Sequence, residues 1–379
     1  MNKKGFTLVE LLAVIAILAI LVIIALPNVL KMFNDSKKNS FLTEAKTVYS
    51  EVSKKYISES MKGNKLTYVS SEDETKLDMT GKKLQYCVLL NADGSVKSMK
   101  VSNGTWIAEL SGNKKITDLK SSDLKDGNLD NEECGPKKPK TFKDDDWDTI
   151  ANAVRTGQTS NYHVGDEKEV DLGTYGKHMV RIANMSTPSE CNQEGFSQSA
   201  CGFVVEFTDI ITTHVMNPSG DYNGKTYNYG WSKDGWPKSQ VKTFIDNDIY
   251  NSLPNELKNV IVDTKTVSSH GSEDTDNFTS IDKLYLLAPK EIWSDWALKY
   301  DLAKDFTRQL DYYKSKGVTT GDYAGSIKNN SSGSATLWWL RSAASNGSLY
   351  FYTAHNSGCW TMSHAAYDAG GVSPAFRIG

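Results

Sequence analysis

The segment from Lys3 to Leu26 reads KKGFTLVELLAVIAILAILVIIAL, and it decides how the whole chain is organised. From Leu11 onward it is apolar without interruption, and Glu10 is its only charged residue after Gly5. A helix of about 20 apolar residues spans the hydrocarbon core of a bilayer. Basic residues precede this run, so we expect a single-pass helix whose short N-terminus stays in the cytoplasm while the rest is exported.

Two features separate this segment from an ordinary membrane anchor or secretory signal peptide. No small-x-small cleavage site follows the apolar run, where the sequence is Ala25-Leu26-Pro27-Asn28. A carboxylate inside a membrane span costs at least about 2.5 kcal/mol by insertion scales, and it normally has a partner. Glu10 therefore indicates a specific interaction, and a plain membrane anchor is the alternative.

The run from Lys3 to Leu12 resembles the class III signal of type IV prepilins and of type II secretion pseudopilins. The resemblance implies that residues 1–5 are a leader, that a prepilin peptidase cuts between Gly5 and Phe6, and that it N-methylates Phe6. It also implies that Glu10 neutralises the N-terminal amine of a neighbouring pilin subunit in a helical fibre. Buried unlike charges are tolerated when they pair in this way. The cytoplasmic membrane would hold the subunit before assembly.

The helix is expected to continue well beyond the membrane. Pro27 lacks a backbone donor and should kink the helix. After it, apolar residues recur mostly every three or four positions, as in an amphipathic helix; they are Leu30, Phe33, Phe41, Ala45, Val48, Val52 and Tyr56. We expect one helix over residues 6–61, with this stripe packed on a head formed by residues 62–134.

Three short segments of the head are predicted to be strands: 84–90, 96–101 and 105–110. Turn sequences separate them, at residues 91–94 (NADG) and 102–104 (SNG). Connections this short make neighbouring strands antiparallel. A helix with a small antiparallel sheet is also what the pilin resemblance implies, so residues 6–134 are predicted to form a pilin-like domain.

The exported part of the chain, where disulfides are permitted, contains the five cysteines Cys87, Cys134, Cys191, Cys201 and Cys359. Spacing alone does not fix their connectivity. The pilin resemblance supports a Cys87–Cys134 bridge, because pilins often tie their C-terminal region to the sheet. Cys191 and Cys201 bracket a short loop and are expected to pair locally, which leaves Cys359 over. No CxxC or HxxxH spacing accompanies them, so we expect no metal site.

A second domain is predicted after a basic, proline-containing linker at residues 135–143. Asp144, Asp145 and Asp146 precede a helical pattern that ends at Gly157. Further helices are expected at 239–251, 255–259 and 303–316, and strands at 168–172, 177–184, 203–207, 284–287, 338–341, 349–352 and 375–378. The helices do not alternate regularly with the strands, so residues 144–379 are expected to form an irregular α+β domain.

The C-terminal part carries a second resemblance. The sequences WWLRS at residues 338–342 and GVSPAFRI at residues 371–378 resemble a bacterial surface domain of unassigned function, which recurs in modular extracellular proteins. The same ending is similar, more distantly, to formylglycine-generating-enzyme-like and C-type-lectin-like folds. That similarity implies an irregular α+β domain whose termini lie close together.

The second domain contains no recognised catalytic signature. Its histidines fall into no metal or protease motif, and no P-loop, GxSxG or GxGxxG sequence occurs. Cys359 with His355 or His364 could imitate a nucleophile pair, but a packed small residue is the interpretation that we prefer. We therefore expect no enzyme activity and no cofactor, and a membrane-tethered enzyme is the alternative.

Aromatic residues between glycines and asparagines form a candidate ligand surface in the second domain, because exposed rings stack on glycans and anchor protein contacts. Packing of these rings in the core is the alternative, and it is the more common arrangement of such residues. The candidates are Tyr222, Tyr227, Tyr229, Trp231 and Trp236. A net charge of −3 argues against dedicated nucleic-acid binding. These observations predict a modular type IV pilin subunit, minor or at the fibre tip, that displays an adhesin-like domain for an unknown glycan or protein. A secretion or competence pseudopilin is the alternative.

Overall fold

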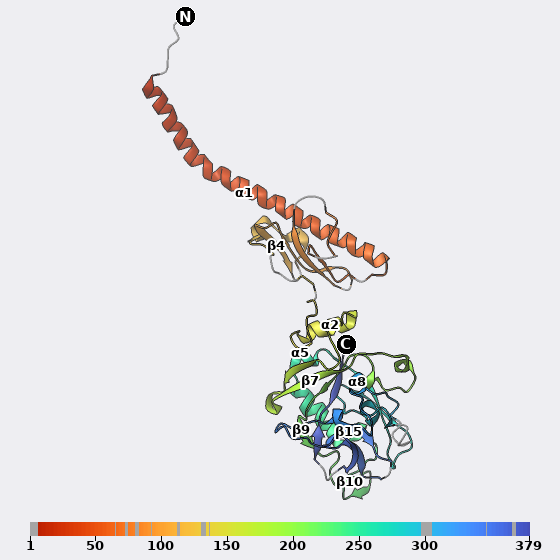
Figure 1. Ribbon diagram of the computed structural model, residues 1–379. Coiled ribbons are helices and arrows are strands. Elements are labelled where there is room, and N and C mark those ends of the chain that lie inside the picture. The colour runs from red at the N-terminus through yellow and green to blue at the C-terminus, as the bar shows by residue number, and fades with distance from the viewer. Residues whose placement is uncertain are drawn as a thin grey trace. The chain divides into compact units, whose positions relative to one another are not determined.

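Two compact units make up the chain in the computed structural model, which describes residues 7–64, 66–72, 75–79, 83–91, 93–111, 114–129, 134–135, 137–296, 305–345, 347–365 and 369–379. The first unit ends at Lys137 and the second begins at Lys138 (Figure 1). This division falls between residues 135 and 143, where the sequence places a linker. Phe142, near the end of that stretch, already belongs to the hydrophobic core of the second unit.

Helix α1, Leu8–Met61, is the largest element of the first unit. It begins after the N-cap Thr7 and is followed by Gly63, whose φ of 82° is left-handed. A left-handed glycine is a common helix stop, and the helix ends at the predicted residue. Pro27 lies inside α1 without ending it, and Figure 1 shows a curved but unbroken ribbon.

A five-stranded antiparallel sheet packs against the C-terminal part of α1. Its strands, in spatial order, are β1 (Tyr68–Ser70), β2 (Gln85–Leu90), β3 (Val96–Ser102), β4 (Trp106–Ser111) and β5 (Lys125–Asp126). The three predicted strands of the head are confirmed as β2, β3 and β4. Phe41, Ala45 and Val48 of α1 share a buried core with Val88 and Val101 of the sheet. The amphipathic stripe therefore supplies the helix side of this core from Phe41 onward.

Two five-stranded sheets form the frame of the second unit. The first has the order β12 (Ile261–Val262), β19 (Ala375–Ile378), β8 (Val204–Phe207), β7 (Lys177–Asn184) and β6 (Glu167–Asp171). The second has the order β17 (Trp360–His364), β16 (Tyr350–Ala354), β15 (Trp338–Ala343), β18 (Gly370–Val372) and β9 (Thr212–His214). Strands β15 and β18 pair in parallel, and the other neighbours pair antiparallel.

Hairpins and short helices complete the second unit. The hairpins are β10 (Gly220–Tyr222) with β11 (Lys225–Tyr227), and β13 (Thr264–Ser268) with β14 (Phe278–Asp282). The helices are α2 (Trp147–Thr156), α3 (Gln240–Phe244), a π-helical turn (Ile245–Ile249), α4 (Tyr250–Ser252), α5 (Asn255–Lys258), α6 (Pro289–Ile292) and α8 (Asp311–Ser315). Helix α2 has Asp146 as its N-cap and the left-handed Gly157 as its C-cap. The fold is α+β, as expected.

Two elements predicted for the second unit are wrong. Residues 284–287 form no strand: Tyr285 makes an isolated bridge to Ala375, and all four side chains are buried. A short buried apolar run does not distinguish a strand from a buried connection. The helix predicted at 303–316 is reduced to α8. Residues 303 and 304 lie outside the described residues, and Phe306 has a φ of 43°, which no α-helix accommodates.

The core of the second unit encloses two ion-pair networks. Glu206 accepts hydrogen bonds from Arg181 Nε (2.9 Å) and Lys328 Nζ (2.8 Å). Arg341 forms a two-pronged pair with Glu291, at 2.6 and 2.7 Å. Buried charges are tolerated when they are paired and hydrogen-bonded. These networks therefore join segments that are far apart in the sequence.

Candidate assembly and ligand-binding surfaces

The start of α1 is a capping box. Glu10 Oε2 accepts hydrogen bonds from the backbone N–H of Thr7 (2.9 Å) and from Thr7 Oγ1 (2.8 Å), while the Glu10 N–H donates to Thr7 Oγ1 (3.3 Å). This reciprocal arrangement satisfies backbone donors that the first helical turn leaves unpaired. The predicted cleavage and methylation residues, Gly5 and Phe6, lie outside the described residues.

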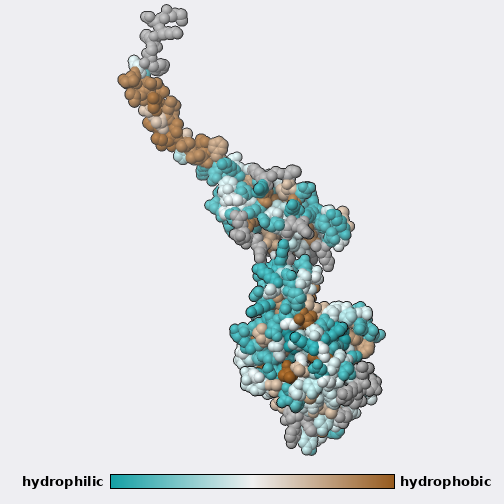
Figure 2. Space-filling view, viewed as in Figure 1, coloured by the Kyte–Doolittle hydropathy of each residue, from teal (hydrophilic) through white to brown (hydrophobic). Residues whose placement is uncertain are grey.

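The surface of α1 from Leu8 to Phe33 is exposed and mostly apolar, as the brown surface of the helix in Figure 2 shows. Its large apolar side chains expose between 42% of their surface, at Val29, and 76%, at Leu8. Helix α1 is the one helix among the described residues that is long and apolar enough to cross a membrane. A bilayer or another protein must cover an apolar surface of this extent, so this stretch is the candidate membrane and assembly surface.

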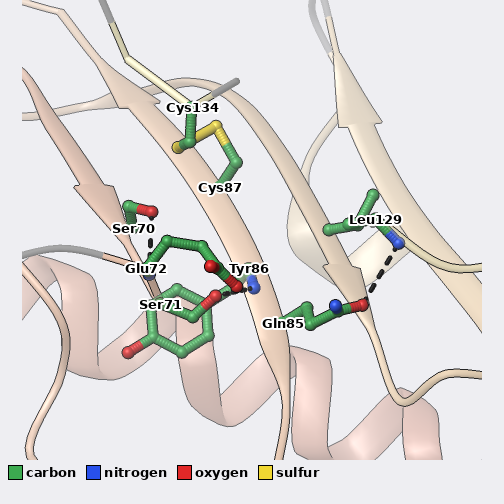
Figure 3. Close-up of a pocket in the computed structure, with 8 residues that line it drawn as sticks. All are labelled: Ser70, Ser71, Glu72, Gln85, Tyr86, Cys87, Leu129 and Cys134. Carbon is green, nitrogen blue, oxygen red and sulfur yellow. Dashed lines mark hydrogen bonds between the residues drawn. A yellow bond between two sulfur atoms is a disulfide. The ribbon is translucent and has the colours of Figure 1, made fainter. Parts of the chain in front are cut away.

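The Cys87–Cys134 disulfide that the pilin resemblance supports is present, and it ties β2 to the segment after β5. Beside it, Gln85 Oε1 accepts a hydrogen bond from the Leu129 N–H (3.2 Å), as Figure 3 shows. An open polar groove of about 450 Å³ continues from Gln85 to Asn103. The disulfide and the glutamine together hold the end of the first unit on its sheet.

The predicted aromatic ligand surface of the second unit is largely wrong. Tyr227, Trp231 and Trp236 expose 3%, 4% and 0% of their surface. Trp236 donates a hydrogen bond from Nε1 to Asp282 (3.0 Å) inside the core. Trp231 is covered by the ring of Tyr222, with the two ring centroids 4.5 Å apart. The sequence shows that these rings lie close to turns, but their inward packing depends on contacts with distant segments.

Tyr222 and Tyr229 are what remains of that predicted surface. They lie in and after the β10–β11 hairpin, at the end of the second unit opposite α2 (Figure 1). The Tyr222 hydroxyl donates to Asp234 (2.8 Å), and burial together with this carboxylate raises the pKa of Tyr222 to about 12. Tyr229 is 45% exposed. The hairpin thus offers one well-exposed ring instead of a broad stacking platform.

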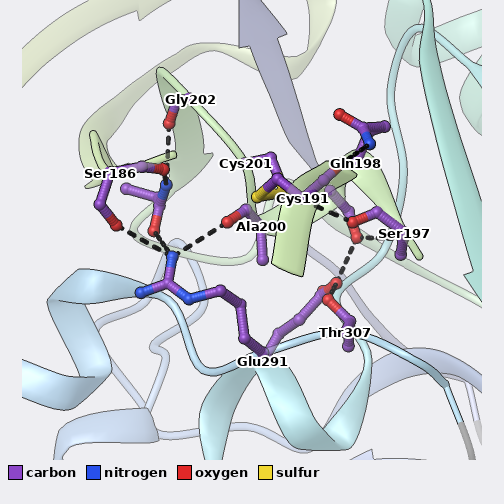
Figure 4. The surroundings of a disulfide bond; sticks show 12 residues. Ser186, Cys191, Ser197, Gln198, Ala200, Cys201, Gly202, Glu291 and Thr307 are labelled. Atoms are coloured by element: carbon purple, nitrogen blue, oxygen red, sulfur yellow. Dashed lines mark hydrogen bonds between the residues drawn. A yellow bond between two sulfur atoms is a disulfide. The ribbon is translucent and has the colours of Figure 1, made fainter. Parts of the chain in front are cut away.

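The Cys191–Cys201 disulfide closes the local loop expected from the sequence (Figure 4). Inside the loop, Gln198 Nε2 donates to the carbonyl of Cys191 (2.9 Å). Ser199, the next residue along, donates to Glu291 of the buried Arg341 pair. The loop is therefore hydrogen-bonded to the buried Arg341–Glu291 network. These contacts indicate a structural role for the loop.

Cys359 is the free cysteine among the described residues, and it is partly exposed. Its Sγ lies 3.2 Å from Ser357 Oγ, which lies 3.1 Å from His355 Nδ1. The serine thus stands between the thiol and the imidazole, whereas a nucleophile and its base contact each other directly. The side chain of His364 lies outside the described residues. No group of three or more His, Cys, Asp or Glu side chains that could hold a metal occurs in the described part of the chain.

Sequence reasoning missed the charged centre of the second unit. Besides the two ion-pair networks, it includes the buried His178, whose Nδ1 lies 2.9 Å from Asp209 and whose Nε2 lies 2.9 Å from the Tyr175 carbonyl. The hydrogen bond with Asp209 raises the pKa of His178. A charged residue inside an apolar strand, such as Glu206 in β8 (VVEF), indicates a buried charge in the sequence. It does not indicate which residue pairs with that charge.

Comparisons with known proteins gave matches to two separate parts of the chain. Residues 1–26 match the model of the prokaryotic N-terminal methylation motif, which shows that the chain carries the class III prepilin signal. This motif implies processing by a prepilin peptidase and assembly with other pilins. Residues 208–379 match the model of a domain of unknown function, DUF6273, which fits a second domain fused to the first. Neither the curated proteins nor the solved structures that were compared gave a match.

Proposed function

We propose that this type IV pilin-like protein is a minor or tip subunit of a type IV pilus, and that its second unit is a binding domain displayed on the fibre. The observation that carries the proposal is the combination of an exposed apolar helix with a second unit that has its own core. The helix suits assembly, and the separate unit suits display of a surface that recognises a glycan or a protein.

Assembly through α1 is supported by how the helix divides along its length. At 1.5 Å per residue, its 54 residues extend about 80 Å. The head covers the stripe that begins at Phe41, whereas the apolar surface up to Phe33 is covered by no described residue. The surface free to pack against other subunits is therefore the one that a bilayer would cover before assembly. In the fibre, Glu10 would pair with the N-terminal amine of a processed neighbour.

The size of the second unit supports a low copy number of this subunit in the fibre. The second unit comprises residues 138–379, a bulk that neighbouring subunits in the body of a tightly packed fibre would have to accommodate at every position. The basic residues before the apolar run favour a cytoplasmic N-terminus of the precursor. Both units would then lie outside, where the two disulfides form.

Mass spectrometry of a sheared surface fraction tests the proposal. We expect an N-terminal peptide that begins with N-methylated Phe6, present at a low ratio to a smaller pilin. A Glu10→Leu variant should still be cut after Gly5 but should be missing from the fibres. Glu51→Leu removes a carboxylate from a part of α1 beyond the membrane, and this control variant should assemble normally.

Three outcomes would contradict parts of the proposal. An intact Met1 N-terminus found only in membranes would contradict assembly into a fibre. A copy number equal to that of the main pilin would contradict a minor or tip position. Processed protein that cofractionates with a secretion or DNA-uptake machine and never with sheared fibres would identify a pseudopilin instead.

A further inference from the structure

Strand β6 is the outer strand of the first sheet of the second unit, and its outer edge can be located from hydrogen bonds. Glu169 of β6 lies opposite Met179 of β7. The Met179 carbonyl accepts a hydrogen bond from the Thr208 N–H (2.9 Å), on the side of β7 that faces β8. Glu169 and Met179 are therefore a pair that exchanges no backbone hydrogen bonds. The backbone N–H and C=O of Glu169 point to the free side of β6.

This edge is open among the residues that the structure describes. The register makes Glu167, Glu169 and Asp171 the residues whose backbone groups point away from β7, and these groups form no hydrogen bond to any other described segment. A groove of about 290 Å³ is lined by residues of β6 together with Trp147 and Pro254. Figure 1 shows α2, α5 and β7 together at the end of the second unit where the chain enters. A free strand edge beside a groove can accept an extended peptide as an additional strand.

Negative charge surrounds the groove. Its lining includes four carboxylates and one cation, Lys168; the carboxylates belong to Asp146, Glu169, Asp171 and Glu256. Lys168 is engaged internally, because its Nζ donates to the carbonyls of Asp145 (2.6 Å) and Lys143 (2.9 Å). Glu169 pairs with Lys177, but these side chains are 54% and 62% exposed. Such a surface pair is weak, and a cation from a partner can replace it.

We propose that the free edge of β6 binds an extended, lysine-bearing segment of a partner protein by adding it as a sixth strand. Glu167, Glu169 and Asp171 point to one face of the strand at every second position, so lysines at alternate positions of the partner would lie opposite them. Charged residues on an edge strand also keep unwanted strands away. Here the carboxylates would repel an acidic strand and attract a basic one. The inference rests on the proposed binding role of the second unit and names the class of its partner.

A short fluorescent peptide of alternating threonine and lysine tests the inference on the full chain in detergent micelles. Fluorescence anisotropy should show saturable binding that weakens at least about tenfold when the salt rises from about 50 to about 500 mM. The matching threonine–glutamate peptide should not bind. Two N-methylated forms of the lysine peptide, each blocking one alternate set of amides, distinguish strand addition from simple charge attraction. One form should lose binding, and the other should keep it.

Substitutions in β6 locate the site. Glu169→Pro removes the N–H that faces the free edge and breaks no hydrogen bond to β7. An outer strand tolerates proline at such a position. The substitution should weaken binding about tenfold. Glu169→Thr keeps the N–H and should weaken binding less. Glu190→Thr removes an exposed carboxylate outside β6 and should leave the affinity unchanged.

Several results would overturn strand addition at β6. They are the absence of saturable binding, equal binding of the two N-methylated peptides, and unchanged binding by Glu169→Pro. The peptide comparison uses the unaltered protein, so it is decisive even if the proline variant does not fold. Assembly is measured separately on the sheared fibre fraction, so a failure of peptide binding would leave the pilus-subunit proposal standing.

Discussion

Glu206 and Lys328 form a fully buried ion pair in the second unit, with Lys328 Nζ 2.8 Å from Glu206 Oε2. Lys328 also donates to the Phe207 carbonyl (2.7 Å) and to Ser373 Oγ (3.0 Å). Arg181 binds the other oxygen of the same carboxylate, so two cations share one anion. Burial of this excess positive charge lowers the pKa of Lys328 to about 8.

This arrangement predicts that the second unit becomes more stable as the pH rises from 8 to 10. The unfolded chain keeps the lysine proton up to about pH 10.4, whereas the folded chain releases it near pH 8. The unfolded state therefore binds more protons in this window, and the free energy of unfolding rises with pH. We expect a gain of about 2 kcal/mol relative to a Lys328→Met variant.

Urea unfolding followed by tryptophan fluorescence measures this gain. Trp106 is the single tryptophan of the first unit, so the signal comes mainly from the second. Tyrosine titration affects the unaltered protein and the variant alike and cancels in their difference. A difference in stability between the two proteins that stays constant from pH 8 to pH 10 would refute the prediction.

His178 should make the free energy of unfolding decrease with rising pH in a lower pH range. Both of its ring nitrogens face acceptors, so the doubly protonated ring makes both hydrogen bonds, and the Asp209 hydrogen bond raises its pKa. A raised pKa gives stability that is fully present below about pH 6.5, the value for an unfolded histidine, and that is lost as the pH rises through the folded value. The free energy of unfolding should therefore decrease between pH 6 and pH 8, and this decrease should be larger in the unaltered protein than in Asp209→Asn. Equal falls would show that the pair contributes no pH dependence.

Substitutions of Arg341 and Glu291 should each lower the free energy of unfolding strongly, and the two losses should not be additive. The guanidinium uses its donors on both Glu291 oxygens, on the carbonyls of Val267 and Leu286, and on Ser199. Lysine has three donors and no fork, so Arg341→Lys should destabilise the second unit by about 3–5 kcal/mol.

A double-mutant cycle separates the pair from its surroundings. Arg341→Met alone leaves the Glu291 carboxylate buried without its cation, so the double variant with Glu291→Leu should be more stable than the sum of the two single losses implies. Urea unfolding gives all four free energies. Strict additivity would mean that the two residues contribute independently.

The Cys87–Cys134 disulfide predicts where the first unit is vulnerable. Its residues are 47 positions apart, and closing a loop of that size stabilises by about 4 kcal/mol in the chain-entropy model. Replacing both cysteines with alanine should free the segment from Lys125 to Cys134 and make the Lys125 bond accessible to trypsin. Limited proteolysis with mass spectrometry detects that cut. Replacing Cys191 and Cys201 instead should leave the rate of cleavage at Lys125 unchanged.

Two glycines of the second unit predict different costs for the same substitution. Both have left-handed φ values, 90° at Gly358 and 79° at Gly333. A Cβ at Gly358 would lie 2.2 Å from the Tyr323 carbonyl oxygen, whereas at Gly333 it would meet nothing within 4 Å. Gly333→Ala should cost about 1–2 kcal/mol through backbone strain alone, and Gly358→Ala an additional 1–3 kcal/mol or so. Thermal unfolding of the two variants checks this difference.

The local elements of the fold were largely accessible from the sequence, because their signals are local. The strand predicted at 177–184 has the bounds of β7, and the acidic N-cap and the glycine after α2 marked that helix. The capping box at Thr7 and Glu10 lies within the motif that identified the prepilin signal. Periodicity and capping act within a few residues, so one sequence is enough to detect them.

The long-range arrangement was not accessible. Trp231 and Trp236 lie in a sequence that is typical of an exposed loop, yet they are buried by Tyr222 and by residues near Asp282. The apolar run at residues 284–287 predicts a strand, but these residues are apolar because they are buried in a connection. The groove beside β6 combines residues from α2, β6 and α5, and no local pattern places these elements together.

The position of β19 has a consequence for the order in which the chain matures. Its residues, Ala375–Ile378, lie between β12 and β8 inside the first sheet of the second unit, although β19 follows all four other strands of that sheet along the chain. The ribosome therefore makes both neighbours of β19 before the strand that joins them. A product truncated before Ala375 would present the unpaired edges of β8 and β12 to proteases.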